Sequence, residues 1–334
     1  MVYIYKKIVA GKSYYSLRIS ERKGKRVIAR DLKYLGSNIK EVKKVLNNLT
    51  EYKGDIRKAH RTITLFLETN YYLEKVKALK LKKDDYLLDK LEDLEACKMH
   101  FIKVFNKLPK LTKKEIFKNY IIEFAYNTAS MEGNTINLEE ARNLLNEGIT
   151  PKDKTLREIY DLQNTEKVFF DILNNKLGDE LNHKLIIEIH DQLLEKIDER
   201  RGYRTTDIRV VNSNFDASPG KYVRTDMDLL LKWFNENKNK LHPLVLAIVF
   251  HHKFEKIHPF SDGNGRTGRM VVNYILLKNN LPPTIIRKKF RKEYLEAMRE
   301  ADESDLWKIS EKVYSGLIAY CASEFIASYW NIFL

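Results

Sequence analysis

The sequence is poor in the residues that mark several protein classes. Among 334 residues there are only 2 cysteines, 7 prolines and 13 glycines. Two cysteines cannot build a disulfide framework, and so low a count is typical of a reducing compartment, so we expect a cytoplasmic protein. The scarcity of glycine and proline argues against collagen-like, low-complexity and β-sandwich chains. The first residues contain no apolar core of a secretory signal, so none is expected.

Long apolar runs are also scarce, with one exception at the C-terminal end. Residues 315–334 are mostly apolar and contain a single charge, Glu324. An apolar stretch of this length is long enough for a membrane anchor. However, apolar residues recur there every three to four positions, which is the period of an amphipathic helix; they are Leu317, Cys321, Phe325, Tyr329 and Ile332. We therefore expect a helix that packs on the protein body or on a partner chain, and no membrane partner.

Positive charge is abundant and unevenly distributed. The chain has 60 Lys and Arg against 46 Asp and Glu, a net charge of +14. Residues 1–60 alone have 16 basic and 5 acidic residues, a net charge of +11. This excess indicates either a surface for nucleic acid or an acidic partner, or a solvated sheet whose lysines protect its edges. The second interpretation is favoured here, because no known nucleic-acid-binding motif accompanies the charge.

Hydrophobic periodicity predicts a mainly α-helical protein with a small β module. Strand-like alternation over 2–9, 14–20 and 27–36 predicts a three-stranded meander, and residues 38–59 are predicted to be helical. We therefore expect a basic α/β module at 1–60, a helical linker at 61–110 and a helical domain at 111–334. Within the last domain, the β-branched stretch 203–223 predicts a β-hairpin flap.

The residues that indicate chemistry lie in 257–270, IHPFSDGNGRTGRM. Gly263, Asn264 and Gly265 form a turn before a helical pattern, so backbone N–H groups and the helix dipole would attract an anion. Arg266 and Arg269 are three residues apart, on one face of the first turn, and would hold polyphosphate. Asp262 precedes the turn and could bind Mg²⁺ that bridges to phosphate oxygens. His258 has the chemistry of a general base for a hydroxyl.

The segment HPFSDGNGRTGR resembles the signature of the Fic family, HxFx[DE]GNGRxxR, at every fixed position, and the resemblance covers roughly residues 115–310. It implies a Fic-type helical bundle that transfers AMP from ATP to a Ser, Thr or Tyr hydroxyl of a protein. The implied roles are proton acceptance by His258, Mg²⁺ binding by Asp262 and phosphate binding by the residues from Gly263 to Arg266 and by Arg269. Asn273 is implied to lie near the adenosine.

A second segment, TASMEGN at 128–134, resembles the inhibitory pattern of the same family, [ST]xxxE[GN]. Thr128, Glu132 and Gly133 occupy its fixed positions. The resemblance implies the class whose inhibitory helix precedes the signature, with Glu132 paired to Arg269 so that ATP cannot bind productively. In some relatives the same glutamate helps to remove AMP from a modified target. For this chain, both addition and removal of AMP stay open.

Two alternatives to adenylylation stay open as well. The enzyme could transfer another nucleotide or phosphate-containing group, although the intact Gly-Asn-Gly turn favours AMP. The chain could also be a regulator that binds a nucleotide, or a nucleic acid through residues 1–60. The expected partners are a protein target with an exposed hydroxyl, the chain itself through self-modification, and a second copy in a homodimer.

Overall fold

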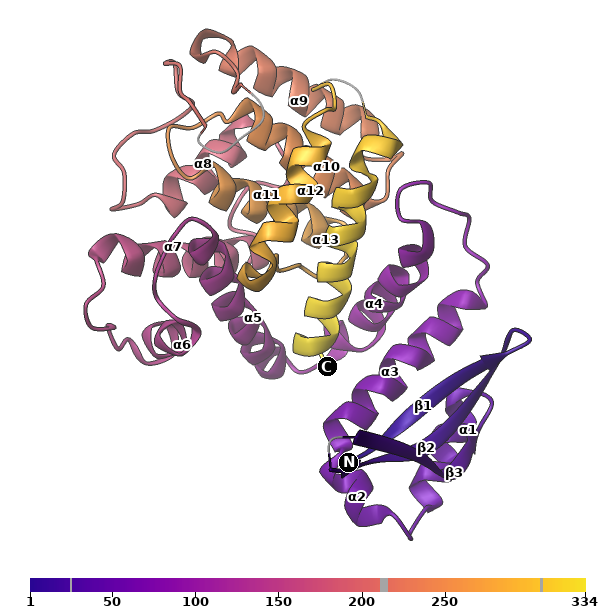
Figure 1. Ribbon diagram of the computed structural model, residues 1–334. Coiled ribbons are helices and arrows are strands. Elements are labelled where there is room, and N and C mark those ends of the chain that lie inside the picture. Colours follow the sequence, from indigo (N-terminus) through magenta and orange to yellow (C-terminus); the bar gives the residue numbers. More distant parts are fainter. Residues whose placement is uncertain (25, 211–215, 307–308) are drawn as a thin grey trace. The chain divides into compact units, whose positions relative to one another are not determined.

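The computed structural model describes residues 1–24, 26–210, 216–306 and 309–334. The chain forms two compact units (Figure 1). The N-terminal unit comprises Met1–Lys82, Glu95–His100 and Leu334, and the second unit comprises Lys83–Leu94 and Phe101–Phe333. Each unit has its own core, and they are described separately below.

The N-terminal unit is built on the predicted meander. Strands β1 (Val2–Val9), β2 (Lys12–Lys23) and β3 (Arg26–Gly36) form an antiparallel sheet in the order β1-β2-β3. Residues of alternating positions point to opposite faces of a sheet, and one face carries the buried pair Ile4 and Leu17, which are partners across β1 and β2.

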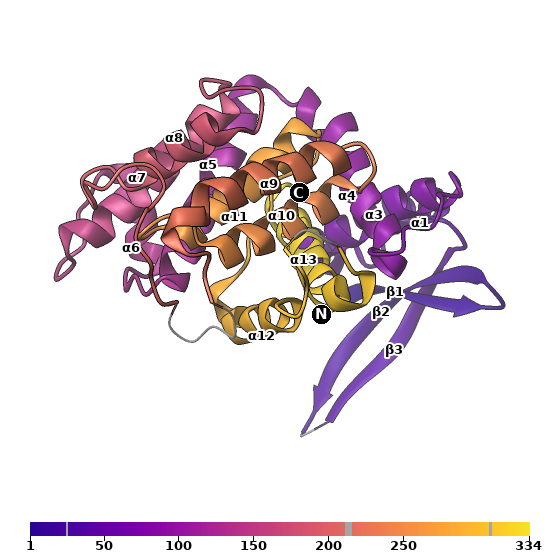
Figure 2. The same ribbon diagram turned by 90° about the horizontal axis from the view of Figure 1, so that it is seen from above.

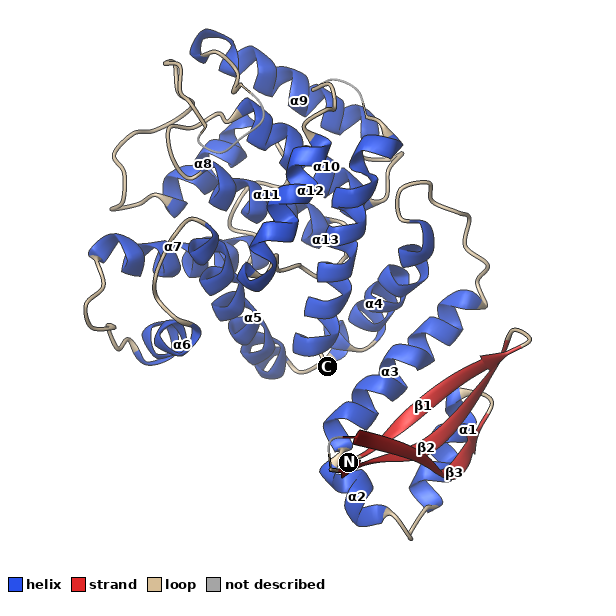
Figure 3. Ribbon diagram, viewed as in Figure 1, coloured by secondary structure: helices blue, strands red, loops and turns tan. Residues whose placement is uncertain are grey.

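Three of the described helices lie wholly within this unit, and α1 and α3 contribute buried residues to the core on the apolar face of the sheet (Figures 2 and 3). They are α1 (Ile39–Asn48), α2 (Lys53–Lys58) and α3 (His60–Lys77). The single helix predicted over 38–59 is therefore two helices, interrupted between residues 48 and 53. Helix α3 is joined to the sheet by hydrogen bonds, since the Tyr15 hydroxyl donates to Glu74 Oε1 at 2.9 Å and Lys6 Nζ donates to Asn70 Oδ1 at 3.0 Å. The division of the chain at residues 60 and 110 stays a prediction.

The second unit is helical, as the periodicity predicted (Figure 3). Its described helices of ten or more residues that lie wholly within the unit are α5 (Lys110–Met131), α6 (Leu138–Glu147), α7 (Leu156–Leu173), α8 (His183–Leu193), α9 (Val223–Asn237), α10 (Pro243–Ile257), α11 (Asn264–Lys278), α12 (Arg291–Ala301) and α13 (Glu311–Ile332). Helix α4 (Leu91–Lys103) runs through both units. A capping box begins α6, because the side chains of Asn137 and Glu140 each accept a hydrogen bond from the other's backbone N–H group.

Helices α10 and α11 form the centre of this unit. Both are buried along almost their whole length, including residues 244–254 and 266–276. A helix that is apolar on every side is stable only when other helices surround it, and here α9 and α13 pack on α10 while α5, α7 and α8 pack on α11. The loop between α10 and α11 is therefore held by a rigid support.

The C-terminal stretch forms helix α13, which packs in the protein body. Leu317, Cys321, Phe325 and Tyr329 are buried. Glu324 is also buried and accepts hydrogen bonds from the guanidinium of Arg287, at 2.9 Å from Nε. In the part of the chain that the structure describes, no helix has the length and apolarity needed to cross a membrane.

The predicted β-hairpin over 203–223 is wrong for the residues that can be described. Residues 203–210 and 216–219 are irregular, and Gly220–Tyr222 form a 3-10 turn; the predicted tip at 211–215 lies outside the described residues. Side chains take the place of a strand ladder, because Arg204 donates to the carbonyls of Thr206 and Ser218, and Asp207 accepts from the N–H of Gly220. Pro219 has no N–H to donate.

Candidate active site

The loop from His258 to Gly263 reverses the chain between α10 and α11. His258 ends α10 in the left-handed region, at φ 52°, and its N–H still donates to Phe254 O at 2.9 Å. Gly263 precedes α11, also in the left-handed region, at φ 78°. A left-handed histidine is uncommon and costs free energy, so it persists only where the surroundings hold it.

Arg204 is the residue that holds the end of α10. Its Nε donates to the carbonyl of His258 at 2.8 Å, and its Nη2 donates to that of Ile257 at 3.2 Å. Its backbone N–H donates to Pro259 O at 2.9 Å. The last carbonyls of a helix have no partners within the helix, so one buried guanidinium satisfies them and fixes the backbone that carries the histidine.

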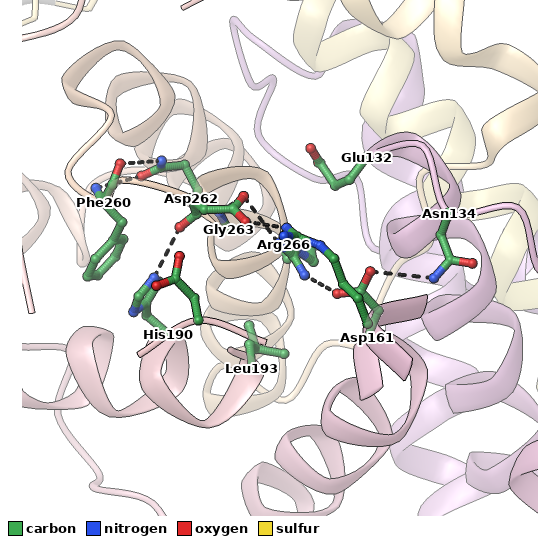
Figure 4. A network of polar contacts seen from close by, with 12 residues as sticks. Glu132, Asn134, Asp161, His190, Leu193, Phe260, Asp262, Gly263 and Arg266 are labelled. Atoms are coloured by element: carbon green, nitrogen blue, oxygen red, sulfur yellow. Dashed lines mark hydrogen bonds and ion pairs between the residues drawn. The ribbon is translucent and has the colours of Figure 1, made fainter. Parts of the chain in front are cut away.

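Asn264 fixes the rest of the loop. Its side-chain Oδ1 accepts from the N–H of Phe260 at 2.9 Å, and its Nδ2 donates to the carbonyl of the same residue at 2.8 Å. The Phe260 ring lies flat on His190, with ring centroids 3.7 Å apart, and His190 Nε2 is 3.1 Å from the carbonyl oxygen of Asp262 (Figure 4). His190 thus packs beneath the loop.

Asp262 and Arg266 lie at the centre of a chain of polar contacts (Figure 4). The carboxylate of Asp262 accepts from Gly263 N–H at 2.6 Å and from Arg266 Nη2 at 3.3 Å, and its other oxygen contacts Arg157 of α7. Arg266 is buried and also pairs with Asp161 of α7. Two residues of α7, Arg157 and Asp161, therefore orient Asp262 and Arg266 of the signature.

Arg269 and Glu132 form the contact that the inhibitory pattern implied. Arg269 Nη2 donates to Glu132 Oε1 at 2.6 Å. Thr128 takes part as well, because its hydroxyl oxygen accepts from Arg269 Nε at 2.7 Å and its carbonyl accepts from Nη2 at 3.1 Å. Arg269 is only 6% exposed at its side chain and Glu132 is 38% exposed, since it ends α5 at the rim of the site.

Gly265 makes room for this pair. A Cβ atom at residue 265 would lie 2.3 Å from Glu132 Oε1 and 2.9 Å from Arg269 Nη1. Both distances are shorter than any ordinary contact, so a side chain at this position is incompatible with the observed ion pair. The glycine of the turn is therefore required by the bound carboxylate as well as by the close approach of any anion to the backbone.

A cavity of about 310 Å³ opens at this point. It brings together the predicted residues His258, Asp262, Gly263, Asn264, Gly265, Arg269 and Glu132. Three other predicted residues, Thr128, Gly133 and Arg266, are not part of its lining. Thr128 and Arg266 contact residues of the lining, since Thr128 accepts from Arg269 and Arg266 donates to Asp262. Asn273 is buried elsewhere, where its amide exchanges two hydrogen bonds with the backbone of Thr284, at 2.7 and 3.1 Å. Its contact with adenosine stays a prediction.

Sequence reasoning missed several residues of this cavity. Helix α12 lines it with Arg291, Tyr294, Leu295, Met298 and Arg299. These positions repeat at intervals of three and four, which marks a single helix face, and that periodicity together with the two arginines was the available signal. Arg291 Nε donates to Met131 O at 3.3 Å, next to Glu132.

Burial controls the protonation of the titratable groups in the cavity. It lowers the pKa of His258, with a further contribution from the Arg204 charge, so the imidazole is neutral near pH 7. Burial raises the pKa of Glu255 to about 8 and lowers that of His251, which lies 3.7 Å away, to about 3. Partial burial raises the pKa of Glu132, but the charge and hydrogen bond of Arg269 outweigh it, so this pKa lies below its usual value.

Parts of the chain are similar to known proteins. Residues 180–276 match the Fic/DOC family. A protein adenylyltransferase Fic from Culex quinquefasciatus is 32% identical over 203 residues, which are 58% of this chain and 39% of that protein. A protein adenylyltransferase fic-1 from Caenorhabditis elegans is 28% identical over 207 residues, which are 60% of this chain and 41% of that protein.

Solved structures show the same helical fold. A Fic domain containing signaling protein from Bacteroides thetaiotaomicron matches with a TM-score of 0.64 and 24% identity, over 72% of this chain and 95% of that one. Fic-1 from C. elegans matches with a TM-score of 0.60 and 21% identity, over 89% of this chain and 92% of that one.

These findings show that residues 180–276 of the second unit are similar to the Fic/DOC family, and the signature at 258–269 lies within this match. The chain is therefore similar to Fic proteins over part of its length. It spans about two fifths of the length of the curated relatives that it matches.

Proposed function

We propose that this protein transfers AMP from ATP to a Ser, Thr or Tyr hydroxyl of a protein, and that Glu132 inhibits the reaction. The observation that carries the proposal is that a neutral histidine, a helix N-terminus and a buried arginine line one cavity. The relatives named protein adenylyltransferase support the same reaction.

His258 acts as the general base. Its Nδ1 is 3.3 Å from the carbonyl oxygen of Glu255, which can only accept a hydrogen bond, so Nδ1 carries the proton and Nε2 keeps a free lone pair. The target hydroxyl oxygen bonds to the α-phosphorus while the bond from that phosphorus to the bridging oxygen breaks. Pyrophosphate leaves with the electron pair, and the hydroxyl proton goes to Nε2 of His258.

The first turn of α11 binds the phosphates. The leading N–H groups of a helix have no acceptor within it and carry the positive end of its dipole. Gly263 and Gly265 leave this backbone uncovered by side chains, and Asn264 fixes its position through Phe260. Arg269 is the cation for the outer phosphate once Glu132 has left it. Most of the catalysis is thus positioning and charge stabilisation.

Asp262 is the residue that would hold Mg²⁺. Its carboxylate lines the cavity and is oriented by the N–H of Gly263. In the ranges that the structure describes, no three His, Cys, Asp or Glu side chains gather into a metal-binding group. A single carboxylate suits Mg²⁺, which usually takes one or two carboxylates together with substrate phosphates. When bound, this ion offsets the negative charge of the phosphates.

Glu132 holds the enzyme inactive by occupying Arg269. Keeping the site closed in about 99% of the molecules requires a free-energy difference of about 2.7 kcal/mol between the closed and open states. This is half of the difference needed to shift an equilibrium from about 1:99 to about 99:1. A charge-assisted hydrogen bond to a buried guanidinium is strong enough to provide most of it. Thr128 orients the guanidinium toward the carboxylate, and Gly133 ends the turn after α5, at φ 98°.

The test is transfer of label from ATP labelled at the α-phosphate, with Mg²⁺ and the full chain as its own acceptor. Glu132→Gly should raise self-labelling by up to about a hundredfold, and Glu132→Gln should raise it less, because the amide still binds the guanidinium. Glu139→Gly, an exposed glutamate on α6, is the matched control and should change nothing. If Glu132→Gly transfers no label from ATP, UTP or CTP, to itself or to proteins of a cell lysate, the proposal fails.

A further inference from the structure

The sheet of the N-terminal unit has one face that no helix of that unit covers. The helices α1 and α3 pack on the opposite face, through the core that contains Ile4 and Leu17 (Figure 2). The strand register assigns the uncovered side chains, here called the open face: Tyr3, Tyr5, Lys7 and Val9 of β1, Lys12, Tyr14, Ser16, Arg18, Ser20 and Arg22 of β2, and Val27, Ala29, Asp31 and Tyr34 of β3. Tyrosines and basic residues thus lie together on β1 and β2, and β3 adds Tyr34.

The tyrosine rings of the open face are accessible. Tyr5, Tyr14 and Tyr34 are 36%, 39% and 54% exposed. Tyr5 and Tyr34 stand on either side of Ser16 in one cross-strand row, and the guanidinium of Arg18 lies over the Tyr5 ring, 3.6 Å from its centroid. A sheet that only needs solubility gains nothing from rings that face water, because exposed apolar area is unfavourable.

The charge around these rings is positive. Asp31 shares the open face, but it pairs with Arg18, with 2.6 Å between Nε and Oδ1. Beyond Val2, the first residue of β1, strands β2 and β3 continue as a two-stranded ribbon that includes the exposed Arg22 and Arg26. With a net charge of +11 over residues 1–60, a second copy of this face would be repelled, whereas a polyanion would be attracted.

We propose that the open face binds single-stranded nucleic acid, with bases stacked on its tyrosines and phosphates bound by its lysines and arginines. Aromatic rings on an open, positively charged sheet are the means by which proteins bind unpaired bases. A duplex would leave the rings without a role, because its base faces are already stacked. The proposal is independent of the transfer reaction, and it departs from the expectation of a merely solvated sheet, which the sequence alone favoured.

The experiment is a fluorescence anisotropy titration of a labelled 20-nucleotide strand with the full chain, in the absence of ATP. RNA and DNA single strands and the corresponding DNA duplex are compared, and the His258→Ala variant should bind like the unaltered chain. Either single strand should bind more tightly than the duplex. If three phosphates are neutralised, affinity should fall about twentyfold between 50 and 200 mM salt.

Variants separate stacking from charge. Tyr14→Ala combined with Tyr34→Ala should weaken binding at least tenfold, while the corresponding Phe changes should retain most of it. Lys7→Ala with Lys12→Ala should weaken binding and reduce its salt dependence. Lys40→Ala with Lys44→Ala removes the same charge from the exposed side of α1 and is the matched control. Unchanged thermal unfolding of each variant shows that the unit is folded.

Several results would overturn the proposal. These are no binding up to about 100 μM at 50 mM salt, tighter binding of the duplex, or equal losses in the α1 control. Displacement by polyglutamate as effective as by an unlabelled strand of equal charge would also overturn it, because the face would then recognise charge without bases.

Discussion

The two units both present arginines, but in opposite settings. In the second unit, Arg269 is buried, and Thr128 and Glu132 accept hydrogen bonds from it in one fixed arrangement. In the N-terminal unit, Arg18 lies on an open sheet beside a tyrosine ring, among other cations that face solvent. A buried cation acts through geometry and is little screened by salt, whereas exposed cations act together and are screened within about 10 Å. Specific chemistry is therefore expected from the first setting and adaptable attraction from the second.

Removing the general base, His258, should distinguish the functions of the two units most strongly. In the Glu132→Gly background, His258→Ala should lower transfer of AMP by about a hundredfold or more, because general-base catalysis typically contributes that much. Binding of ATP should change little, since the imidazole does not hold the phosphates. Oligonucleotide binding should not change at all, and a parallel loss there would mean that the two regions are coupled.

Removing the loop support should have the next largest effect. Asn264→Ala deletes two hydrogen bonds to the backbone of Phe260 and leaves buried groups without partners, at a cost of about 2 kcal/mol. The free energy of unfolding from urea titration should fall by this amount, and affinity for ATP should fall because the N–H groups of the turn are no longer held. Asn279→Ala, at the other end of α11, is a comparison in which only one side-chain hydrogen bond is lost.

Salt should distinguish the buried ion pair from the open face. Between 50 and 200 mM salt, the ratio of transfer by Glu132→Gly to transfer by the unaltered chain should change less than twofold, because Arg269 is shielded from ions. Over the same range, nucleic-acid affinity should fall about twentyfold. A ratio that falls as steeply as the affinity would show that the Glu132–Arg269 pair is too exposed to act as an inhibitor.

The last prediction concerns Glu255, whose pKa is raised to about 8 by burial. Between an ordinary carboxyl pKa and pH 8, this group keeps its proton in the folded protein and loses it on unfolding, so its contribution to stability falls as pH rises. The slope is at most about 1.4 kcal/mol per pH unit. Unfolding free energies from pH 6 to pH 8 should therefore fall less in Glu255→Gln than in the unaltered chain, and parallel curves would contradict the assignment.

Local patterns in the sequence were sufficient for much of the fold. Alternation predicted the three strands, and the recurrence of apolar residues every three to four positions predicted the C-terminal helix, which is α13. The hairpin prediction was wrong for residues 203–210 and 216–223, since β-branched composition does not reveal that Arg204 and Asp207 bind the backbone groups that a strand ladder would need.

The signature identified the centre of the site, but its supports were harder to see. Arg157 and Asp161 lie about a hundred residues before their partners, and no local pattern connects α7 with Asp262 and Arg266. The open face was also beyond sequence reasoning, because composition gave its charge without showing that the tyrosines share one side of the sheet. Only the strand register places them together.

Arg204 has a consequence for how a target would be selected. The Arg204 guanidinium donates hydrogen bonds to the carbonyl of His258 and also to those of Thr206 and Ser218. Thr206 and Ser218 mark two segments that precede His258 by 40 or more positions. A protein that docks on either segment and displaces it would move the histidine with it. Docking of the target would then also set the position of His258 for proton transfer. A target that fits poorly would bind without reacting.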